Sequence, residues 1–266
     1  MRISVKRWSE YLRIFYCLLW ADIAALIHDF KGDFVDACVW MFCDVSFCAY
    51  VMPLMGLPSW YGLFVGASVA NNQGLFDCYN SISGLVADYE GDRVLLFPLS
   101  LPIPAWMVFF KVALVRAIRT MCIVLLLLPL LFILLYTKLG AMKLSPFKFL
   151  FASWNILLLS GLFSVWASSI PKNSSTVGRV TTRILLPLWV FGGTWASWKV
   201  FNSAMPFLGK LLLLNPFLHG SESLRAAVMG QAGYLPYWSS VLAIIGFSVL
   251  FCVWGVWRLK KRLDFV

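Results

Sequence analysis

The sequence predicts an all-α membrane protein with six transmembrane helices, preceded by an amphipathic helix in the membrane interface. Of its 266 residues, 61% are hydrophobic and only 13% are charged, whereas a soluble domain carries about a quarter charged residues. No polar stretch is long enough to form a separate soluble domain. The lysines and arginines flank the apolar runs, so the net charge of +10 indicates orientation in a membrane and not nucleic-acid binding. Residues 1–266 are therefore predicted to form a single transmembrane domain.

Residues 1–32 are predicted to form the interface helix. The apolar stretch 14–27 contains Asp22 and is shorter than the roughly 20 residues that a spanning helix needs. Apolar side chains recur at steps of three and four, which is typical of one helix face lying on a membrane surface; they are Val5, Trp8, Leu12, Phe15, Leu19, Ile23, Leu26 and Phe30.

Residues 33–266 are predicted to form the six-span bundle. The expected spans are 34–55, 61–85, 119–137, 149–170, a fifth beginning near 184, and 235–257. Gly192 and Gly193 interrupt the fifth span. Sixteen of the 22 lysines and arginines fall on the side of the N-terminus and six on the other side, which predicts that both termini are cytoplasmic.

Several kinds of catalytic site are excluded by the motifs that the sequence lacks. It contains no G-x-x-x-x-G-K-[ST] phosphate-binding loop, and its only histidines, His28 and His219, lie too far apart in the sequence for an H-E-x-x-H zinc site. Ser68 follows Gly66 and Ala67, but no predicted span contains a histidine that could activate it. The seven cysteines form no metal-ligand pattern. We therefore predict no catalytic residues, no metal site and no enzymatic activity of the chain's own.

The second predicted span is unusually polar. Polar groups are costly in lipid and face a cavity or another helix. One interpretation is a translocation path for a hydrophilic substrate, to which Asp44 of the first span would contribute. The alternative is hydrogen bonding between helices. The residues concerned are Asn71, Asn72, Gln73, Asp77 and Asn80.

The predicted cytoplasmic loop after this span reads YEGDRVLLFPLS and begins with an acidic cluster. A short amphipathic helix bounded by prolines would suit docking onto a partner, whereas the alternative is an ordinary solvated loop. The residues assigned to this coupling segment are Asp88, Glu90, Gly91, Asp92, Arg93, Leu95 and Pro98.

A short polar helix is predicted between the last two spans. Asn215 is a favourable N-cap, Pro216 suits the first helical position and Gly230 can end the helix. His219, Glu222 and Arg225 lie at i, i+3 spacing and therefore share one face. Together with the apolar piece 205–214, the segment is expected to form a re-entrant hairpin that dips into the outer leaflet as a lid.

These features together resemble the permease subunit of type-2 ABC exporters, which export polysaccharides, lipid-linked glycans and drugs. NPFLHGSESLR resembles the family's Asn-Pro…His…Glu…Leu-Arg signature in Asn215, Pro216, His219, Glu222, Leu224 and Arg225. YEGDRVLLFPLS resembles its coupling segment in Glu90, Gly91, Leu95 and Pro98, but Asp92 stands where threonine is usual. The resemblance covers the whole chain and depends mainly on the order of the motifs.

The resemblance implies a location in the bacterial inner membrane and an assembly of two permeases with two ABC ATPase subunits. A second copy of this chain would form the homodimer. The chain itself would bind no cofactor, and ATP and Mg would bind on the ATPase. The alternative from another class is a passive channel or lipid scramblase that needs no ATPase.

Overall fold

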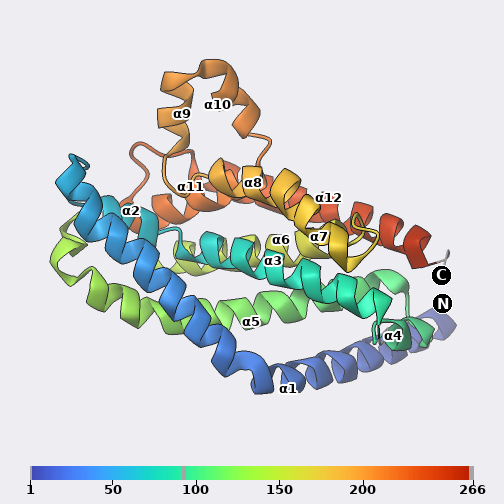
Figure 1. The fold of residues 1–266 in the computed structure, drawn as a ribbon. Coiled ribbons are helices and arrows are strands. Elements are labelled where there is room, and N and C mark those ends of the chain that lie inside the picture. The colour runs from blue at the N-terminus through green and yellow to red at the C-terminus, as the bar shows by residue number, and fades with distance from the viewer. Residues whose placement is uncertain (1, 92–93, 264–266) are drawn as a thin grey trace.

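The computed structural model describes residues 2–91 and 94–263 and is all-helical over these ranges, with twelve α-helices and no strand. Asp92 and Arg93 of the expected coupling segment lie outside the described residues. Both termini and α4 (Leu96–Ser100) lie at one end of a bundle of roughly aligned helices (Figure 1).

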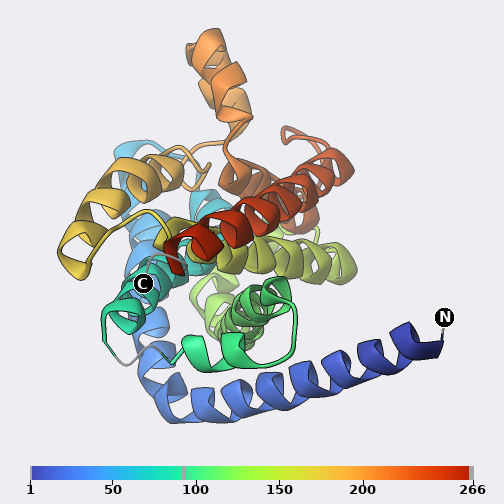
Figure 2. The same ribbon diagram turned by 90° about the vertical axis from the view of Figure 1, so that its right-hand side faces the viewer.

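The first helix, α1, is continuous from Arg2 to Ser46, which differs from the expected separate interface helix and first span. It contains no proline that would break it. Its first half lies across the end of the bundle, and the helix then changes direction to follow the other helices (Figures 1 and 2). Two ion pairs join it to α5 (Ala105–Leu134): Asp22 with Lys111, at 2.6 Å, and Asp33 with Arg119.

Four helical segments are long and apolar enough to cross a membrane, so the protein is a plausible multi-pass membrane protein. Their number differs from the six spans expected, because the second and fifth expected spans are broken and more polar. The four segments are Phe30–Met55, Ala105–Leu134, Pro146–Ser168 and Tyr237–Lys261.

The second expected span consists of α2 (Tyr61–Gly66) and α3 (Val69–Glu90). The helical hydrogen-bond pattern breaks between them, because the amide of Ser68 donates to Val65 O and not to the carbonyl of Phe64, four residues back. The first half of α3 is nevertheless almost completely buried.

The fifth expected span begins earlier than predicted and is also broken. It consists of α7 (Ser174–Val180), a π-helical turn η4 (Thr181–Leu185) and α8 (Leu186–Val190). An irregular loop of residues 191–197 follows. Gly193 in this loop has a φ of +81°, which glycine adopts without steric cost. The interruption at Gly192 and Gly193 thus coincides with the predicted one.

The most buried of the four apolar segments is α6 (Pro146–Ser168), which packs against α3, α5 and α12 (Tyr237–Leu263). Small residues allow this packing. A Cβ on Gly74 would lie 2.5 Å from Ser160 Oγ, and one on Gly161 would lie 2.5 Å from the backbone of Ala113. Close approach at small residues is typical of helix association in membranes.

The expected re-entrant pair is organised differently. Residues 205–214 do not form a hairpin with the polar helix. Instead α10 (Pro206–Leu212) pairs with α9 (Trp198–Ala204), and these two helices protrude from the bundle (Figures 1 and 2). The polar helix, α11 (Pro216–Met229), lies inside the bundle against α6 and α12 and is buried along almost its whole length. It is therefore part of the core and not a lid.

Candidate functional site: a buried polar cluster on α11

The start of α11 is fixed by Asn215. Its side-chain oxygen accepts a hydrogen bond from the amide of Phe217, at 3.0 Å, which satisfies one of the free donors at the helix start. Its side-chain amide donates to Leu188 O, at 2.9 Å. The predicted N-cap is confirmed, and it also ties α11 to the last turn of α8.

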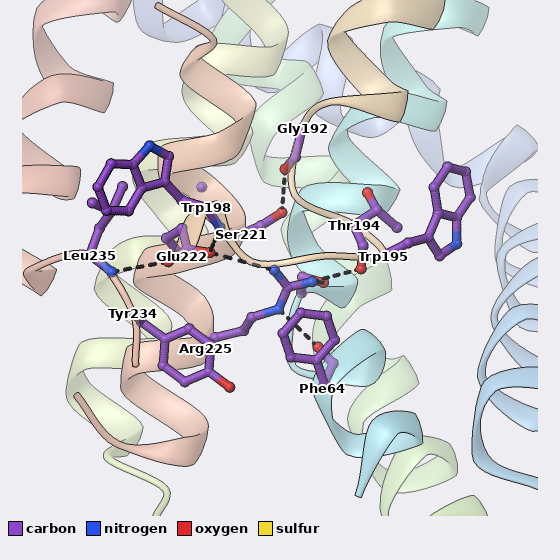
Figure 3. A network of polar contacts seen from close by, with 12 residues as sticks. Phe64, Gly192, Thr194, Trp195, Trp198, Ser221, Glu222, Arg225, Tyr234 and Leu235 are labelled. Carbon is purple, nitrogen blue, oxygen red and sulfur yellow. Dashed lines mark hydrogen bonds and ion pairs between the residues drawn. The ribbon is translucent and has the colours of Figure 1, made fainter. Parts of the chain in front are cut away.

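Arg225 is completely buried and binds backbone groups at both breaks in the bundle (Figure 3). Its Nε donates to Phe64 O at 3.1 Å and its Nη2 donates to Thr194 O at 2.7 Å. The carbonyl of Phe64 is free to accept because the helix breaks at Ser68. The guanidinium also lies over the Phe64 ring, 3.5 Å from the centroid, in a cation–π contact.

Glu222 is also completely buried and binds two backbone amides at the ends of irregular segments (Figure 3). Its Oε1 accepts from the amide of Trp198, the first residue of α9, and its Oε2 accepts from the amide of Leu235, each at 3.0 Å. Oε1 also lies 3.9 Å from Nη1 of Arg225. The two charges therefore compensate each other at a completely buried position.

Polar side chains continue the cluster toward α3. Ser221 donates to Gly192 O and accepts from Asn71 Nδ2, both at 2.8 Å. The hydroxyl of Thr194 donates to Asn72 Oδ1 at 2.9 Å. We call these residues together the α11 cluster: Asn71, Asn72, Thr194, Ser221, Glu222 and Arg225.

His219 does not join this cluster, contrary to the expectation from its spacing. Its Nε2 lies 2.9 Å from Leu213 O, in the turn before α11, and its ring centroid is 6.5 Å from that of Phe247 on α12. Helical spacing placed His219 near the face of Glu222, but the carbonyl of Leu213 provides the nearer partner. The pair Glu222 and Arg225 therefore carries the charge of the cluster.

Tyr234, in the loop between α11 and α12, borders the cluster. Its ring centroid lies 6.4 Å from that of Phe64. Burial raises the pKa of its hydroxyl above the usual value, and the positive charge of Arg225 opposes this increase in part. Tyr234 is consequently neutral near pH 7, where it adds no negative charge to the cluster.

The residues assigned to a translocation path differ in their burial and in their hydrogen-bond partners. Asn71, Asn72 and Gln73 are buried, and two of them hydrogen-bond across segments as described, which favours the second interpretation of their polarity. Asp44 lines a small cavity together with Asn72 and Gln73. Asp77 instead accepts from Ser81 one turn along α3, at 3.3 Å.

Asn80 is exposed on α3. The translocation path stays a prediction.

The described residues of the expected coupling segment make bonds within the chain. Asp88 accepts from the amides of Val94 and Leu95, at 2.8 and 3.1 Å, just before α4. Glu90 accepts from the amide of Ser174, at 3.0 Å, and from its hydroxyl at the start of α7. The carboxylate of Asp88 thus fixes the chain just before α4, and that of Glu90 binds the start of α7.

Gly91 follows the end of α3, whereas Leu95 and Pro98 lie with buried side chains at and within α4. The short helix predicted in this loop is confirmed as α4. Its docking onto a partner stays a prediction.

Several residues of the site were missed by sequence reasoning. Phe64, Thr194, Ser221, Trp198 and Leu235 contribute mainly through backbone groups or small hydroxyls, which form no motif. The one available signal was the glycine pair at 192 and 193, since irregular backbone inside a membrane bundle needs buried hydrogen-bond partners.

The hydroxyl of Ser68 adjoins the same cluster. It accepts a hydrogen bond from Nη2 of Arg225, at 3.3 Å, and donates to Val65 O. Over residues 2–91 and 94–263, no group of three or more His, Cys, Asp or Glu side chains could hold a metal ion.

Comparison of the chain with protein-family models and with curated proteins finds no match.

Proposed function

We propose that the chain is the membrane-spanning permease subunit of an ATP-driven exporter of the type-2 ABC class. Two copies would form the path for a hydrophilic or amphipathic substrate, such as a polysaccharide, a glycolipid or a drug-like molecule. A separate ABC ATPase, also in two copies, would hydrolyse ATP with Mg. The location would be a bacterial inner membrane, with both termini cytoplasmic.

One observation carries the transport part of this proposal. Two of the expected spans are broken inside the bundle, and the freed backbone groups at both breaks bind one buried side chain, Arg225. Broken helices at the centre of a bundle are typical of transporters, where the irregular backbone lies in protein or lines a cavity. A protein with only a scaffolding role needs no such breaks.

The contacts of the acidic segment support the ATPase part. Asp88 holds the start of α4, and Glu90 holds the start of α7. A displacement of this segment would therefore be transmitted to α7, η4 and α8. These elements lead directly to residues 191–197, whose carbonyl at Thr194 binds Arg225. The proposed coupling route thus begins at the end of the bundle where both termini lie, and it leads to the α11 cluster.

Co-purification tests the proposal most directly. The affinity-tagged chain is extracted from its native membranes with a mild detergent, and co-purifying proteins are identified by mass spectrometry. We expect an ATP-binding subunit in equal amount, together with ATP hydrolysis that Glu90→Lys uncouples from export. A pure chain that passes solute or lipid in vesicles without ATP would contradict the proposal and favour a channel or scramblase.

Orientation is tested separately by labelling single cysteines in intact cells and in inverted vesicles. We expect a cysteine at position 172 to react only from the cytoplasmic side and one at position 210 only from the outside. Reaction of position 210 from the cytoplasm would contradict the proposed orientation.

A further inference from the structure

A cavity of about 280 Å³ lies between α2, α5 and α6. Every side chain that lines it is apolar. Its volume is close to the lower limit of about 300 Å³ for ligand sites. The inner lining includes Leu63, Ala67, Leu131, Leu135 and Phe149.

The cavity opens at the side of the bundle. Five of its lining residues are more than a third exposed, namely Leu125, Phe132, Leu144, Pro146 and Leu150. In a membrane such an opening faces acyl chains and not water. The natural occupant of the cavity is therefore a hydrocarbon chain.

Three lysines adjoin the lining residues of this cavity in the sequence, and we call them its rim. Lys138, Lys143 and Lys148 are sequence neighbours of the lining residues Leu139, Leu144 and Phe149. No aspartate or glutamate occurs between residues 93 and 221. The turns 47–60 and 230–236, which join α1 to α2 and α11 to α12, also contain none. The three lysines therefore have no acidic neighbours in these segments to neutralise them.

The basic segment is held in place by α11. The amides of Lys143 and Ser145 donate to the carbonyls of Val228 and Ala227, at 2.7 and 2.8 Å. These bonds satisfy two of the free carbonyls at the end of α11. The turn between α5 and α6 that carries the segment lies at the end of the bundle opposite the termini (Figure 1).

We propose that this cavity and its rim form a binding site for an anionic phospholipid of the surrounding membrane. One acyl chain fills the apolar cavity, and the phosphate lies against Lys138 and Lys143. The ammonium of Lys148 already lies 5.5 Å from the centroid of the Tyr237 ring. The inference requires a membrane location but does not depend on the exporter proposal.

The test uses the full chain purified in a mild detergent. Phosphatidylglycerol and phosphatidylcholine with the same acyl chains are titrated in turn, and bound lipids are counted by native mass spectrometry. We expect one phosphatidylglycerol to bind much more tightly than phosphatidylcholine. Equal affinity of the unaltered chain for the two lipids would overturn the proposal without any variant.

The charge contribution is tested by Lys138→Gln combined with Lys143→Gln. A lysine near an anionic lipid surface contributes about a fivefold increase in affinity, so the double variant should bind phosphatidylglycerol roughly 30-fold more weakly. The matched control is Lys199→Gln combined with Lys210→Gln on the protruding α9 and α10, which should leave the affinity unchanged. An equal loss in both variants would mean non-specific charge attraction and would overturn the site.

The cavity contribution is tested at two adjacent exposed leucines of α5. Leu125 lines the cavity, whereas Leu126 is 50% exposed and does not. Leu125→Trp should fill the opening and reduce the binding of phosphatidylglycerol by at least tenfold, whereas Leu126→Trp should not. Unchanged binding in Leu125→Trp would overturn the placement of the acyl chain. If monomers bind the lipid and dimers do not, a second copy of the chain occupies the cavity in the dimer. This result would also overturn the proposal.

Discussion

In two regions of the molecule, a carboxylate accepts hydrogen bonds from backbone amides, but one region is buried and the other is at least partly exposed. In the α11 cluster, Glu222 accepts from backbone amides at the start of α9 and just before α12, and its side chain is completely buried. At the other end of the bundle, Asp88 and Glu90 accept from amides at the starts of α4 and α7, where the side chains are partly or fully exposed.

This difference in burial determines whether the carboxylate needs a compensating positive charge. Water can take the place of an exposed capping carboxylate, so removing that carboxylate costs little more than the capping hydrogen bond. A buried carboxylate needs a compensating charge, because an isolated charge in an apolar interior is very costly. Arg225 provides this charge for Glu222 and also binds the two breaks. Burial thus converts a helix cap into a fixed connection between distant segments.

Arg225→Met is expected to have the largest effect. The change leaves Glu222 charged and unpaired and removes the donors to Phe64 O and Thr194 O. Breaking a buried ion pair on one side costs about 3–5 kcal/mol. The free energy of unfolding, measured by denaturation with sodium dodecyl sulfate in mixed micelles, should fall by that amount. A loss below 1 kcal/mol would mean that the cluster does not hold the breaks together.

The coupling within the pair should give the next largest effect. Glu222→Gln alone leaves Arg225 charged and unpaired, whereas the double variant with Arg225→Met leaves no charge alone. The loss in the double variant should therefore be smaller than the sum of the single losses by about 0.5–3 kcal/mol. Strict additivity in the same denaturation measurement would show that the two side chains do not interact.

Asp88→Ala should have a smaller effect, because the carboxylate is only partly buried. Loss of a helix cap costs about 0.5–2 kcal/mol, and water can reach the amides of Val94 and Leu95. The matched control is Asp36→Ala on α1, for which the structure gives no capping bond. A loss as large as that of Arg225→Met would remove the distinction between the two regions.

His219→Phe should have the smallest effect. The variant loses one hydrogen bond to Leu213 O, which contributes about 1 kcal/mol, and keeps a ring against Phe247. Combined with Glu222→Gln, its effect should be additive within about 0.5 kcal/mol, since the two residues share no partner. Strong coupling between His219 and Glu222 would show that His219 belongs to the α11 cluster, contrary to the structure.

The sequence predicted the features that depend on local chemistry. The all-helical class follows from the apolar runs, the N-cap at Asn215 from its position before Pro216, and the fifth-span break from Gly192 and Gly193. Each signal lies within a few residues of the feature that it predicts. The short helix α4 was found in the same way, from an apolar run bounded by prolines.

The features that were missed depend on contacts between distant segments. The i, i+3 spacing placed His219 on the face of Glu222, but Leu213 O, six residues earlier, takes its side chain. The partner of α10 was assigned to α11 because both are short and adjacent, whereas α9 forms the hairpin. The role of Arg225 at Phe64, 161 residues away, leaves no trace in local spacing.

Hydrogen–deuterium exchange of the purified chain tests the central claim most directly, which is that Glu222 and Arg225 hold the irregular segments inside the bundle. In the unaltered chain, peptides covering 191–198 and 230–237 should exchange slowly. Arg225→Met should accelerate exchange in 191–198 and leave the peptide at 94–100 unchanged, whereas Asp88→Ala should do the reverse. Unchanged slow exchange in 191–198 after Arg225→Met would contradict the account.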